Sequence, residues 1–438
     1  MKPLTVIRVI LLFVSIARGD SLGAPPIPST AAHTEGATNE ISLDQFLNEV
    51  ASANLDYAVQ RYNVSIAQAA IATAREFPNP TLQLSGARDV THNGQEEMPA
   101  TIAGSLVQTF QMGGKRKYRI RGATQAYASV ASTLEDFLRN LKLDAAAAFA
   151  DALALSRSAE QKRQSAQSLE RLAAVQRERR RLGDISQADM LQSQVEAQQF
   201  ENEVLSAEAD AEKASLALCG FLGRNRTQDH LIAKGNLEQP PREFDVSHLV
   251  TRALEERPDL VALRHARDAA QTRTHEEKAN RIPNLDIGVD WTHSTSSENS
   301  IAPSPAFDSV GLSVSLPIQL WNRNRAAIAS ARFTAEQAQK QLEAAQLKAE
   351  VQIRQAVSGY RSAVERVRQY QSGILQDAAA VLEAKRFSYQ RGQSTLLELL
   401  EAQRTDNEVR SSYNGALADQ AQALIELDRA AHLWEIHF

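Results

Sequence analysis

The chain contains two copies of one long unit. Pro78 and Pro283 lie 205 positions apart, and around them the motif FPNP of the first copy aligns with IPNL of the second. Further along the chain the separation grows, until Gly183 aligns with Gly392 at a distance of 209 positions. Such drift is expected where loops differ in length between two copies of a repeat. The sequence therefore predicts two similar structural halves.

Each copy is predicted to contain the same succession of elements. A helix opens the copy, two strands follow, and a much longer helix leads through a glycine into a return helix. In the first copy these elements are expected at residues 42–76, 81–90, 100–110, 115–181 and, after the glycine, up to Leu218. In the second copy they are expected at residues 247–281, 285–292, 310–318, 323–391 and up to Leu433. The predicted fold class is therefore mainly α with a small β part.

The strands alternate apolar and polar residues, most clearly in LDIGVDWT at residues 285–292. One apolar and one polar face suit the wall of a transmembrane barrel, and they equally suit a soluble four-stranded sheet with one wet face. Four strands cannot close a barrel by themselves, and open sheet edges are not tolerated in lipid. A membrane role therefore requires several chains to share one barrel.

The long helices are predicted to form coiled-coil hairpins. Apolar residues recur about every 3.5 positions in the second copy, at Ile353, Val357, Tyr360, Val364, Val367, Ile374, Ala378 and Val381. The opening and return helices together match the long helix in length, so they are expected to stack end to end along it. Gly183 and Gly392 are expected where the long helix reverses, because glycine adopts the left-handed backbone that ends a helix. The alternative is a glycine tolerated within a continuous helix.

Targeting and linker segments bound the two copies. Residues 1–23 have the basic start, apolar centre and small residues of a secretory signal peptide, and the composition of residues 24–40 predicts a disordered linker. The first repeat is expected at residues 41–219 and the second at residues 247–438, joined by a glycine- and proline-containing segment at residues 220–246. No later stretch is apolar over the roughly 18 residues that a membrane-spanning helix needs.

The composition argues against several functions. The net charge of -5 provides no basic field for a nucleic-acid partner. The single cysteine, Cys219, cannot form an internal disulfide, and the nine histidines are scattered without metal-ligand spacing. No catalytic or nucleotide-binding motif occurs in a supporting context. Neither an enzyme, nor a bound cofactor, nor a resident metal is expected.

Longer motifs carry a family resemblance. Two hairpins with YQRGQSTLLELLEAQ (389–403) at the second turn resemble the TolC-like outer-membrane efflux proteins along nearly the whole mature chain. Within that family, LVQTFQMGGKRKYRIRGA (106–123) and GLSVSLPIQLWNRNRAAIASA (311–331) are similar to the heavy-metal branch, the outer-membrane component of cobalt-zinc-cadmium resistance systems.

The resemblance implies a homotrimer in the outer membrane, with twelve strands in one barrel and the helices forming a tunnel across the periplasm. It implies a passive exit duct for heavy-metal cations, the cargo of this branch. The duct works with a periplasmic adaptor and an inner-membrane proton-driven pump of the resistance-nodulation-division type. Two alternatives remain: a duct for drugs or other organic compounds, and a periplasmic coiled-coil adaptor. An adaptor usually has one hairpin between compact β domains, whereas this chain has two hairpins and two strand pairs.

The resemblance also implies roles for particular residues at the periplasmic entrance. Tyr389 matches a tyrosine that helps to hold the entrance closed, and Asp189 matches an acid of the first hairpin. Glu398 and Glu401 match acids that line the entrance; their i, i+3 spacing places them on one helix face, where three copies would form two stacked carboxylate rings. The alternative is two solvated acids on an outer face.

Two further glycine motifs have expected places in the same fold. Gly183 and Gly392, at the hairpin tips, are where the resemblance implies that the adaptor docks. The run from Gly113 to Arg116 is expected to mark the corner between strand and helix, with its basic side chains at the membrane boundary, rather than a phosphate-binding loop. Outer-membrane lipid is an expected partner of the whole assembly.

Overall fold

The computed structural model describes residues 40–88, 99–223, 231–297 and 303–438, all within one compact unit, Asn39–Phe438. The expected signal peptide and nearly all of the expected linker lie outside the described residues. The first repeat contains the helices α1 (Leu43–Ala53), α2 (Leu55–Arg75), α3 (Lys115–Arg181) and α4 (Gln187–Phe221). The second contains α5 (Val246–Glu256), α6 (Pro258–Ala279), α7 (Arg325–Gln369), a short π-helix (Tyr370–Ile374), α8 (Leu375–Gln390) and α9 (Leu396–Ala431).

The predicted opening helices are each broken in two, which corrects the expectation of one continuous helix per copy. In the first copy, the side chain of Asn54 accepts a hydrogen bond from the backbone N–H of Tyr57 at 3.0 Å and so starts α2 as its N-cap. In the second copy, Pro258 occupies the first position of α6, where its missing N–H leaves no helical bond unmade.

The predicted long helix of the second copy is also interrupted. Five residues form a π-helical turn at Tyr370–Ile374, with Gly373 outside helical backbone angles. The pair Ser372-Gly373 lies at this turn, and Gly/Ser pairs are common places for a helix to deviate. Before the turn, Ile353 and Val357 are buried as predicted, whereas Ile374 and Val381 are exposed and α8 has no buried residue.

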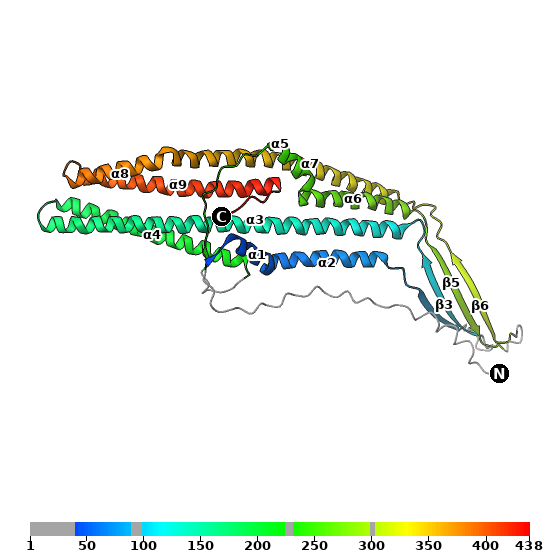
Figure 1. Cartoon of the computed structure of the whole chain (residues 1–438). Helices are drawn as coiled ribbons and strands as arrows, with labels where there is room; N and C mark the ends of the chain where they lie inside the picture. Colours follow the sequence, from blue (N-terminus) through cyan, green and yellow to red (C-terminus); the bar gives the residue numbers. More distant parts are fainter. Residues whose placement is uncertain (1–39, 89–98, 224–230, 298–302) are drawn as a thin grey trace. The chain divides into compact units, whose positions relative to one another are not determined.

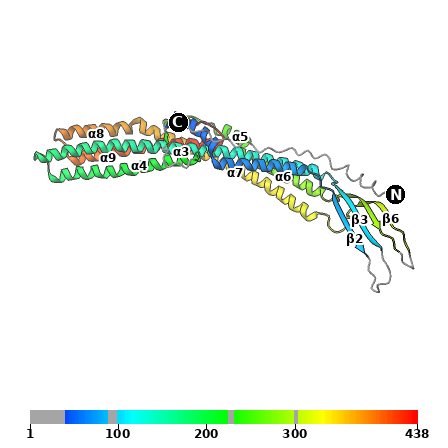
Figure 2. The same cartoon turned by 90° about the horizontal axis from the view of Figure 1, so that it is seen from below.

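The helices pack as their lengths predict. Figure 1 shows α2 and α4 lying one after the other along α3, and α6 and α9 likewise following one another along α7 and α8. Figure 2 shows that the hairpin of α3 and α4 lies beside the hairpin of α8 and α9. The largest buried cluster, which includes Phe46, Phe149, Leu218 and Ile425, joins helices of both repeats. The two copies therefore share one core.

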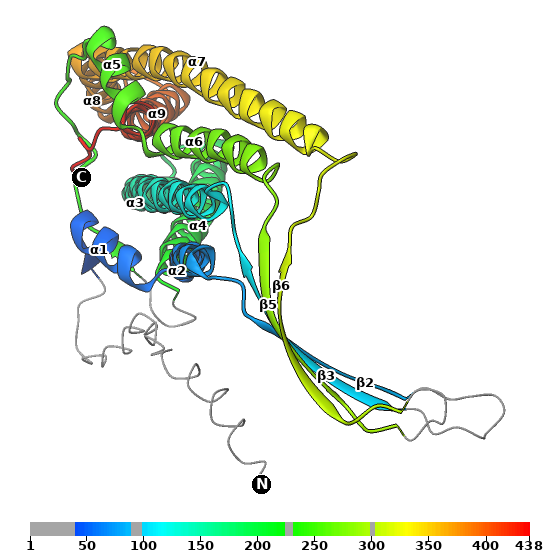
Figure 3. The same ribbon diagram turned by 90° about the vertical axis from the view of Figure 1, so that its right-hand side faces the viewer.

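The four long strands form one antiparallel sheet in the order β2 (Thr81–Arg88), β3 (Ala100–Phe110), β5 (Leu285–Ser294) and β6 (Phe307–Ser315). A separate parallel pair joins β1 (Glu40–Ile41) to β4 (Ile232–Ala233). The predicted last strand, 310–318, is shifted to an earlier position; Pro317, which has no N–H for a ladder bond, lies beyond its observed end. Figure 3 shows the sheet leaving α2, α3, α6 and α7 at one end of these helices.

The two faces of the sheet differ as the alternation predicts. The register places apolar side chains of all four strands on one face: Leu82, Leu84, Ile102, Leu106, Val289, Trp291, Val310, Leu312 and Val314. Each of them is at least 39% exposed. The opposite face carries small and polar residues such as Gln83, Ser105 and Asp290, which lie side by side. A broad apolar surface is therefore left uncovered by this chain.

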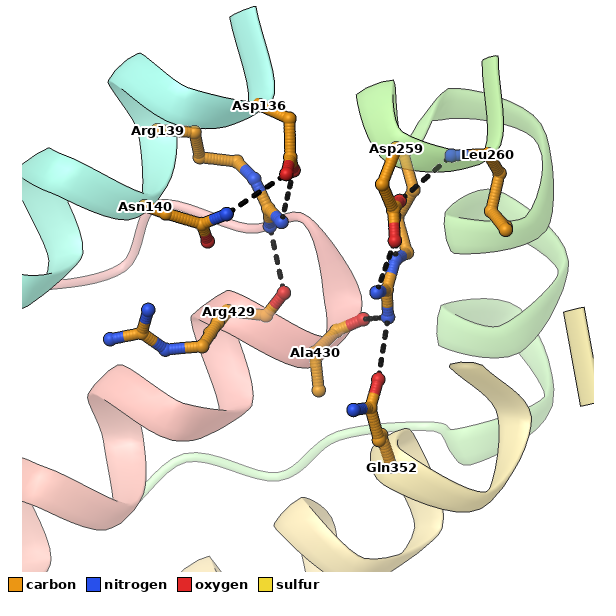
Figure 4. A network of polar contacts seen from close by, with 9 residues as sticks. Asp136, Arg139, Asn140, Asp259, Leu260, Gln352, Arg429 and Ala430 are labelled. Atoms are coloured by element: carbon orange, nitrogen blue, oxygen red, sulfur yellow. Dashed lines mark hydrogen bonds and ion pairs between the residues drawn. The ribbon is translucent and has the colours of Figure 1, made fainter. Parts of the chain in front are cut away.

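The last carbonyls of α9 accept hydrogen bonds from one arginine of each repeat, Arg139 and Arg257. Figure 4 labels Arg139 and the two residues that carry these carbonyls, Arg429 and Ala430. Arg139 of α3 donates a hydrogen bond to the carbonyl of Arg429 at 2.7 Å, and Arg257, before α6, donates to the carbonyl of Ala430 at 3.0 Å. Asp259 holds the Arg257 guanidinium through two bonds, at 2.8 and 3.1 Å. Cations at a helix C-terminus are favourable, because the last carbonyls are unpaired and the helix dipole is negative there.

Candidate functional site

Both hairpin tips are built by the same turn. Gly183 and Gly392 have φ angles of 87° and 72°, the left-handed conformation expected of them. In the first tip, the N–H of Asp184 bonds to the carbonyl of Arg179 at 2.9 Å; in the second, the N–H of Gln393 bonds to the carbonyl of Ser388 at 2.9 Å. With the shorter bonds made by the glycines themselves, each turn is a Schellman motif. Both long helices therefore end here.

The return helices also begin alike. Ser186 caps α4 by accepting a hydrogen bond from the N–H of Asp189 at 3.0 Å, and Thr395 caps α9 by accepting one from the N–H of Glu398 at 3.2 Å. The Asp189 carboxylate in turn accepts from the Ser186 hydroxyl at 2.8 Å. Two of the predicted entrance acids thus take part in equivalent helix caps. The signal was present in the sequence, because an acid three residues after Ser or Thr is typical of a helix start.

The two acids Glu398 and Glu401 have different surroundings. The Glu398 carboxylate forms an ion pair with Lys385 of α8 at 2.5 Å, and its side chain is 42% exposed. The hydrogen bond from Lys385 is the main cause that lowers the pKa of Glu398 below its ordinary value. Glu401 is exposed, and its carboxylate has no hydrogen bond or ion pair within the described parts of the chain. Of the two, Glu401 is the one whose charge is left uncompensated.

Tyr389 connects the two hairpins. Its hydroxyl donates a hydrogen bond to the side chain of Gln176 at 3.0 Å and accepts one from Arg179 at 3.2 Å. Gln176 and Arg179 belong to α3, whereas Tyr389 belongs to α8, so these bonds cross from one repeat to the other. Gln176 is fully buried, and Tyr389 packs beside the apolar cluster that contains Leu400. The predicted gate residue therefore holds the hairpins together near their tips.

Further polar contacts between the hairpins were not predicted. Arg404 of α9 pairs with Glu196 of α4 at 2.9 Å, and the buried Asn407 accepts a hydrogen bond from the hydroxyl of Ser165 in α3 at 2.7 Å. These groups line a cavity of about 360 Å³ between α3, α4 and α9, with Lys162 and Glu203 also on its wall. Helical periodicity in the sequence indicates the buried face of each helix, but it does not indicate which helix that face meets.

Neither a metal-binding cluster nor a membrane-spanning helix is found in the described part of the chain. Within residues 40–88, 99–223, 231–297 and 303–438, no three His, Cys, Asp or Glu side chains are grouped so that they could hold a metal ion. In the same part of the chain, no helix is both long and apolar enough to cross a membrane.

Comparisons with known proteins agree with this architecture. Residues 249–431 match the family model of the outer membrane efflux proteins. The chain is 24% identical to the cobalt-zinc-cadmium resistance protein CzcC of Cupriavidus metallidurans, over 90% of both chains. It is also 24% identical to the pyoverdine export outer membrane protein OpmQ of Pseudomonas putida, over 89% of this chain and 85% of that protein.

A solved structure extends the similarity to three dimensions. The Campylobacter jejuni CmeC outer membrane channel superposes with a TM-score of 0.73 at 14% identity, over 94% of this chain and 93% of that chain. The predicted fold class is therefore confirmed, and residues 249–431, most of the second repeat, match the model of the predicted family. The described chain has two helical hairpins and one four-stranded sheet, rather than the single hairpin between compact β domains that is expected of a periplasmic adaptor.

Proposed function

Because the chain is a TolC-like outer membrane efflux protein, we propose that it is the passive exit duct of a tripartite efflux system and that its cargo is heavy-metal cations. The protein belongs in the outer membrane, with its helices in the periplasm. Its partners would be a periplasmic adaptor and an inner-membrane proton-driven pump of the resistance-nodulation-division type. The duct itself would supply a path and no energy.

The proposed duct requires copies of the chain, and the free edges of the sheet support this step. β2 and β6 are the outer strands, and within the described residues each has a neighbour on one side only. In lipid such an edge must be paired. Pairing β6 of one copy with β2 of the next would continue the sheet, and repetition around an axis would close it. We propose three copies, as in the family, giving twelve strands.

The helices next to these edges support the same pairing. α2 precedes β2 and exposes an apolar stripe of Leu55, Val59, Tyr62 and Ile66, whose spacing of three and four residues is that of one helix face. α7 follows β6 and exposes Phe333, Leu347 and Val351. If β6 pairs with β2 of a neighbouring copy, α7 comes beside α2 of that copy. The pairing would then cover both apolar surfaces.

The proposed entrance lies at the hairpin tips. Tyr389 would restrain the hairpins, and Asp189, Glu398 and Glu401 would supply negative charge near the opening, with Glu401 the least compensated. The exposed turns at Gly183 and Gly392 would receive the adaptor. Carboxylates around a narrow path concentrate cations, which is compatible with a hydrated metal cargo that needs no resident metal site.

The cargo assignment rests on one observation, the similarity to CzcC over 90% of both chains. The similarity to OpmQ, a pyoverdine export protein, favours a second candidate, an organic compound. The test is to delete the gene from its host, restore it on a plasmid, and measure growth with graded Co²⁺, Zn²⁺ and Cd²⁺ and with a panel of organic toxicants. A restored tolerance to the metals alone supports the proposal. Restored tolerance to the organic compounds alone would assign the second candidate.

A further inference from the structure

Positive charge is concentrated where the helices meet the sheet. The strand register places Phe110, Leu285 and Ser315 at one end of the sheet. The helices α2, α3, α6 and α7 end or begin at this same end (Figure 3). Residues 75–81, 111–121, 275–285 and 316–325 join these elements. They hold ten cations: Arg75, Lys115, Arg116, Lys117, Arg119, Arg121, Lys278, Arg281, Arg323 and Arg325. We call these ten residues the basic belt.

In the described part of the chain, no ion pair neutralises the belt. The joining segments contain three acids, and two of them, Glu276 and Glu277, pair with Arg273 at 2.9 and 2.7 Å. Within the described residues, no member of the basic belt has a carboxylate within 4.0 Å. Arg116 instead bonds to the carbonyl of Arg75 at 2.9 Å and lies over the ring of Phe77. Arg116 is thus held in place by uncharged partners.

Two members of the belt occupy positions that are unfavourable for a cation. α3 begins at Lys115 and α7 begins at Arg325, and neither helix has an acid in its first turn. Their N-caps, Gly114 and Asn324, make no side-chain capping bond. A helix N-terminus with free N–H groups attracts anions and repels cations. At the start of α7 the Glu277 carboxylate accepts a hydrogen bond from the Asn324 side chain at 2.9 Å. At the start of α3 no carboxylate of the described residues is bonded to the N-cap, and an external anion would resolve the conflict there.

The segment between β6 and α7 adds an apolar anchor beside these cations. Ile318, Leu320 and Trp321 are 78%, 60% and 93% exposed, and Arg323 follows two residues after the tryptophan. Tryptophan is enriched where a membrane meets water, because its ring is apolar and its N–H is polar. In the sequence, this segment directly follows β6, whose apolar side chains belong to the apolar face of the sheet. The order along the chain is therefore apolar wall, tryptophan, then arginine.

We propose that the basic belt binds the phosphate groups of anionic phospholipids in the periplasmic leaflet of the outer membrane, with Trp321 embedded at the level of their headgroups. The inference rests on the proposed location of the sheet in the membrane, and it adds a preference for one class of lipid. Arg323 and Arg325 would bind the headgroup next to Trp321, and Lys117 and Arg121, one turn apart on α3, would bind another. The basic belt would fix the depth of the duct in the membrane.

Tryptophan fluorescence tests this proposal without measuring transport. The chain has three tryptophans, so Trp291→Phe together with Trp434→Phe leaves Trp321 as the only emitter. This variant is reconstituted in two kinds of vesicle that contain the same fraction of a phospholipid brominated near its headgroup. The brominated lipid is phosphatidylglycerol in one kind and phosphatidylcholine in the other. The brominated anionic lipid should quench Trp321 roughly twofold more strongly than the zwitterionic one. Adding Arg323→Gln and Arg325→Gln should make the two lipids equal.

Two further variants keep the result decisive. Lys117→Gln with Arg121→Gln should reduce the preference from the other side of the belt, so the test does not depend on one pair. Arg177→Gln with Arg181→Gln, exposed arginines near the first hairpin tip, should leave the preference unchanged. Equal quenching by both lipids before any arginine is changed would overturn the proposal while leaving the duct intact. Absence of quenching by either lipid would place Trp321 outside the membrane and would contradict the location of the sheet as well.

Discussion

A buried carboxylate near the C-terminus leads to a quantitative prediction. Asp428 of α9 is fully buried, and its carboxylate accepts a hydrogen bond from the backbone N–H of Glu435 at 2.6 Å. Its other oxygen is buried and has no hydrogen-bond partner within the described residues. Burial raises the pKa of Asp428 from 3.8 to about 7; the hydrogen bond from the backbone N–H of Glu435 opposes this effect, the charge of Glu435 adds to it, and Arg242 opposes it.

The raised pKa of Asp428 determines how the free energy of unfolding changes with pH. Between pH 4 and pH 7 the unfolded chain releases the proton of Asp428 while the folded protein keeps it, so the free energy of unfolding falls as the pH rises. Above pH 7 both states are ionised, and the full cost remains. The gap between 3.8 and about 7 corresponds to an upper limit of about 4 kcal/mol.

Asp428→Asn should remove this cost, because an amide oxygen can still accept the Glu435 bond and carries no charge. At pH 8 the free energy of unfolding of the variant should exceed that of the wild type by up to about 4 kcal/mol, and at pH 5 by about 1.5 kcal/mol. Thermal unfolding in detergent, followed by circular dichroism between pH 5 and pH 8, measures the gap between the two midpoints. Asp419→Asn, on an exposed face of the same helix, is the control. A gap that stays constant with pH, or a variant that is less stable at pH 8, would refute the reasoning.

Three predictions concern the hairpin tips. Gly392→Val should lower metal tolerance while outer-membrane insertion persists, because the left-handed backbone costs an L-residue about 1–2 kcal/mol or more. Gly392→Asn is the control, since asparagine tolerates this backbone, and it should behave like the wild type. Equal losses of tolerance in both variants would indicate a different cause. In single-channel recordings, Glu401→Gln should lower cation selectivity more than Glu398→Gln does, since Lys385 already compensates the charge of Glu398. If both acids are replaced and neither the selectivity nor the block by divalent cations changes, these acids lie on an outer surface. Tyr389→Phe removes two hydrogen bonds between the hairpins and should raise the open fraction, with each bond contributing about 1 kcal/mol; an unchanged open fraction would remove Tyr389 from the gate.

Much of this architecture could be predicted because the sequence contains the same structural unit twice. The recurrence of Gly183 and Gly392 located both hairpin turns, and the alternation in LDIGVDWT located a strand with one apolar face. The repeat also gave the succession of elements. The local interruptions were not predicted. The helix breaks at Asn54 and Pro258 and the π-helical turn at Gly373 all fall inside patterns that are periodic on both sides.

The site was less predictable than the fold. The family resemblance predicts Asp189 and Glu398 as acids of the entrance, whereas their position three residues after a capping hydroxyl also gives each a structural role. The partners of Tyr389 and Arg404 lie on the other hairpin, more than 200 residues away. Periodicity in one chain contains no information about such pairs, because it indicates which face is buried and not what covers it. Their roles at an entrance stay predictions.

The central claim is that the chain is one part of a duct that several copies complete. Native mass spectrometry of the protein purified from outer membranes in detergent measures this directly. The account predicts one dominant species with three times the mass of the mature chain, because the free edges of β2 and β6 must pair with neighbouring copies. A folded single chain that stays in solution after the detergent is removed would contradict it.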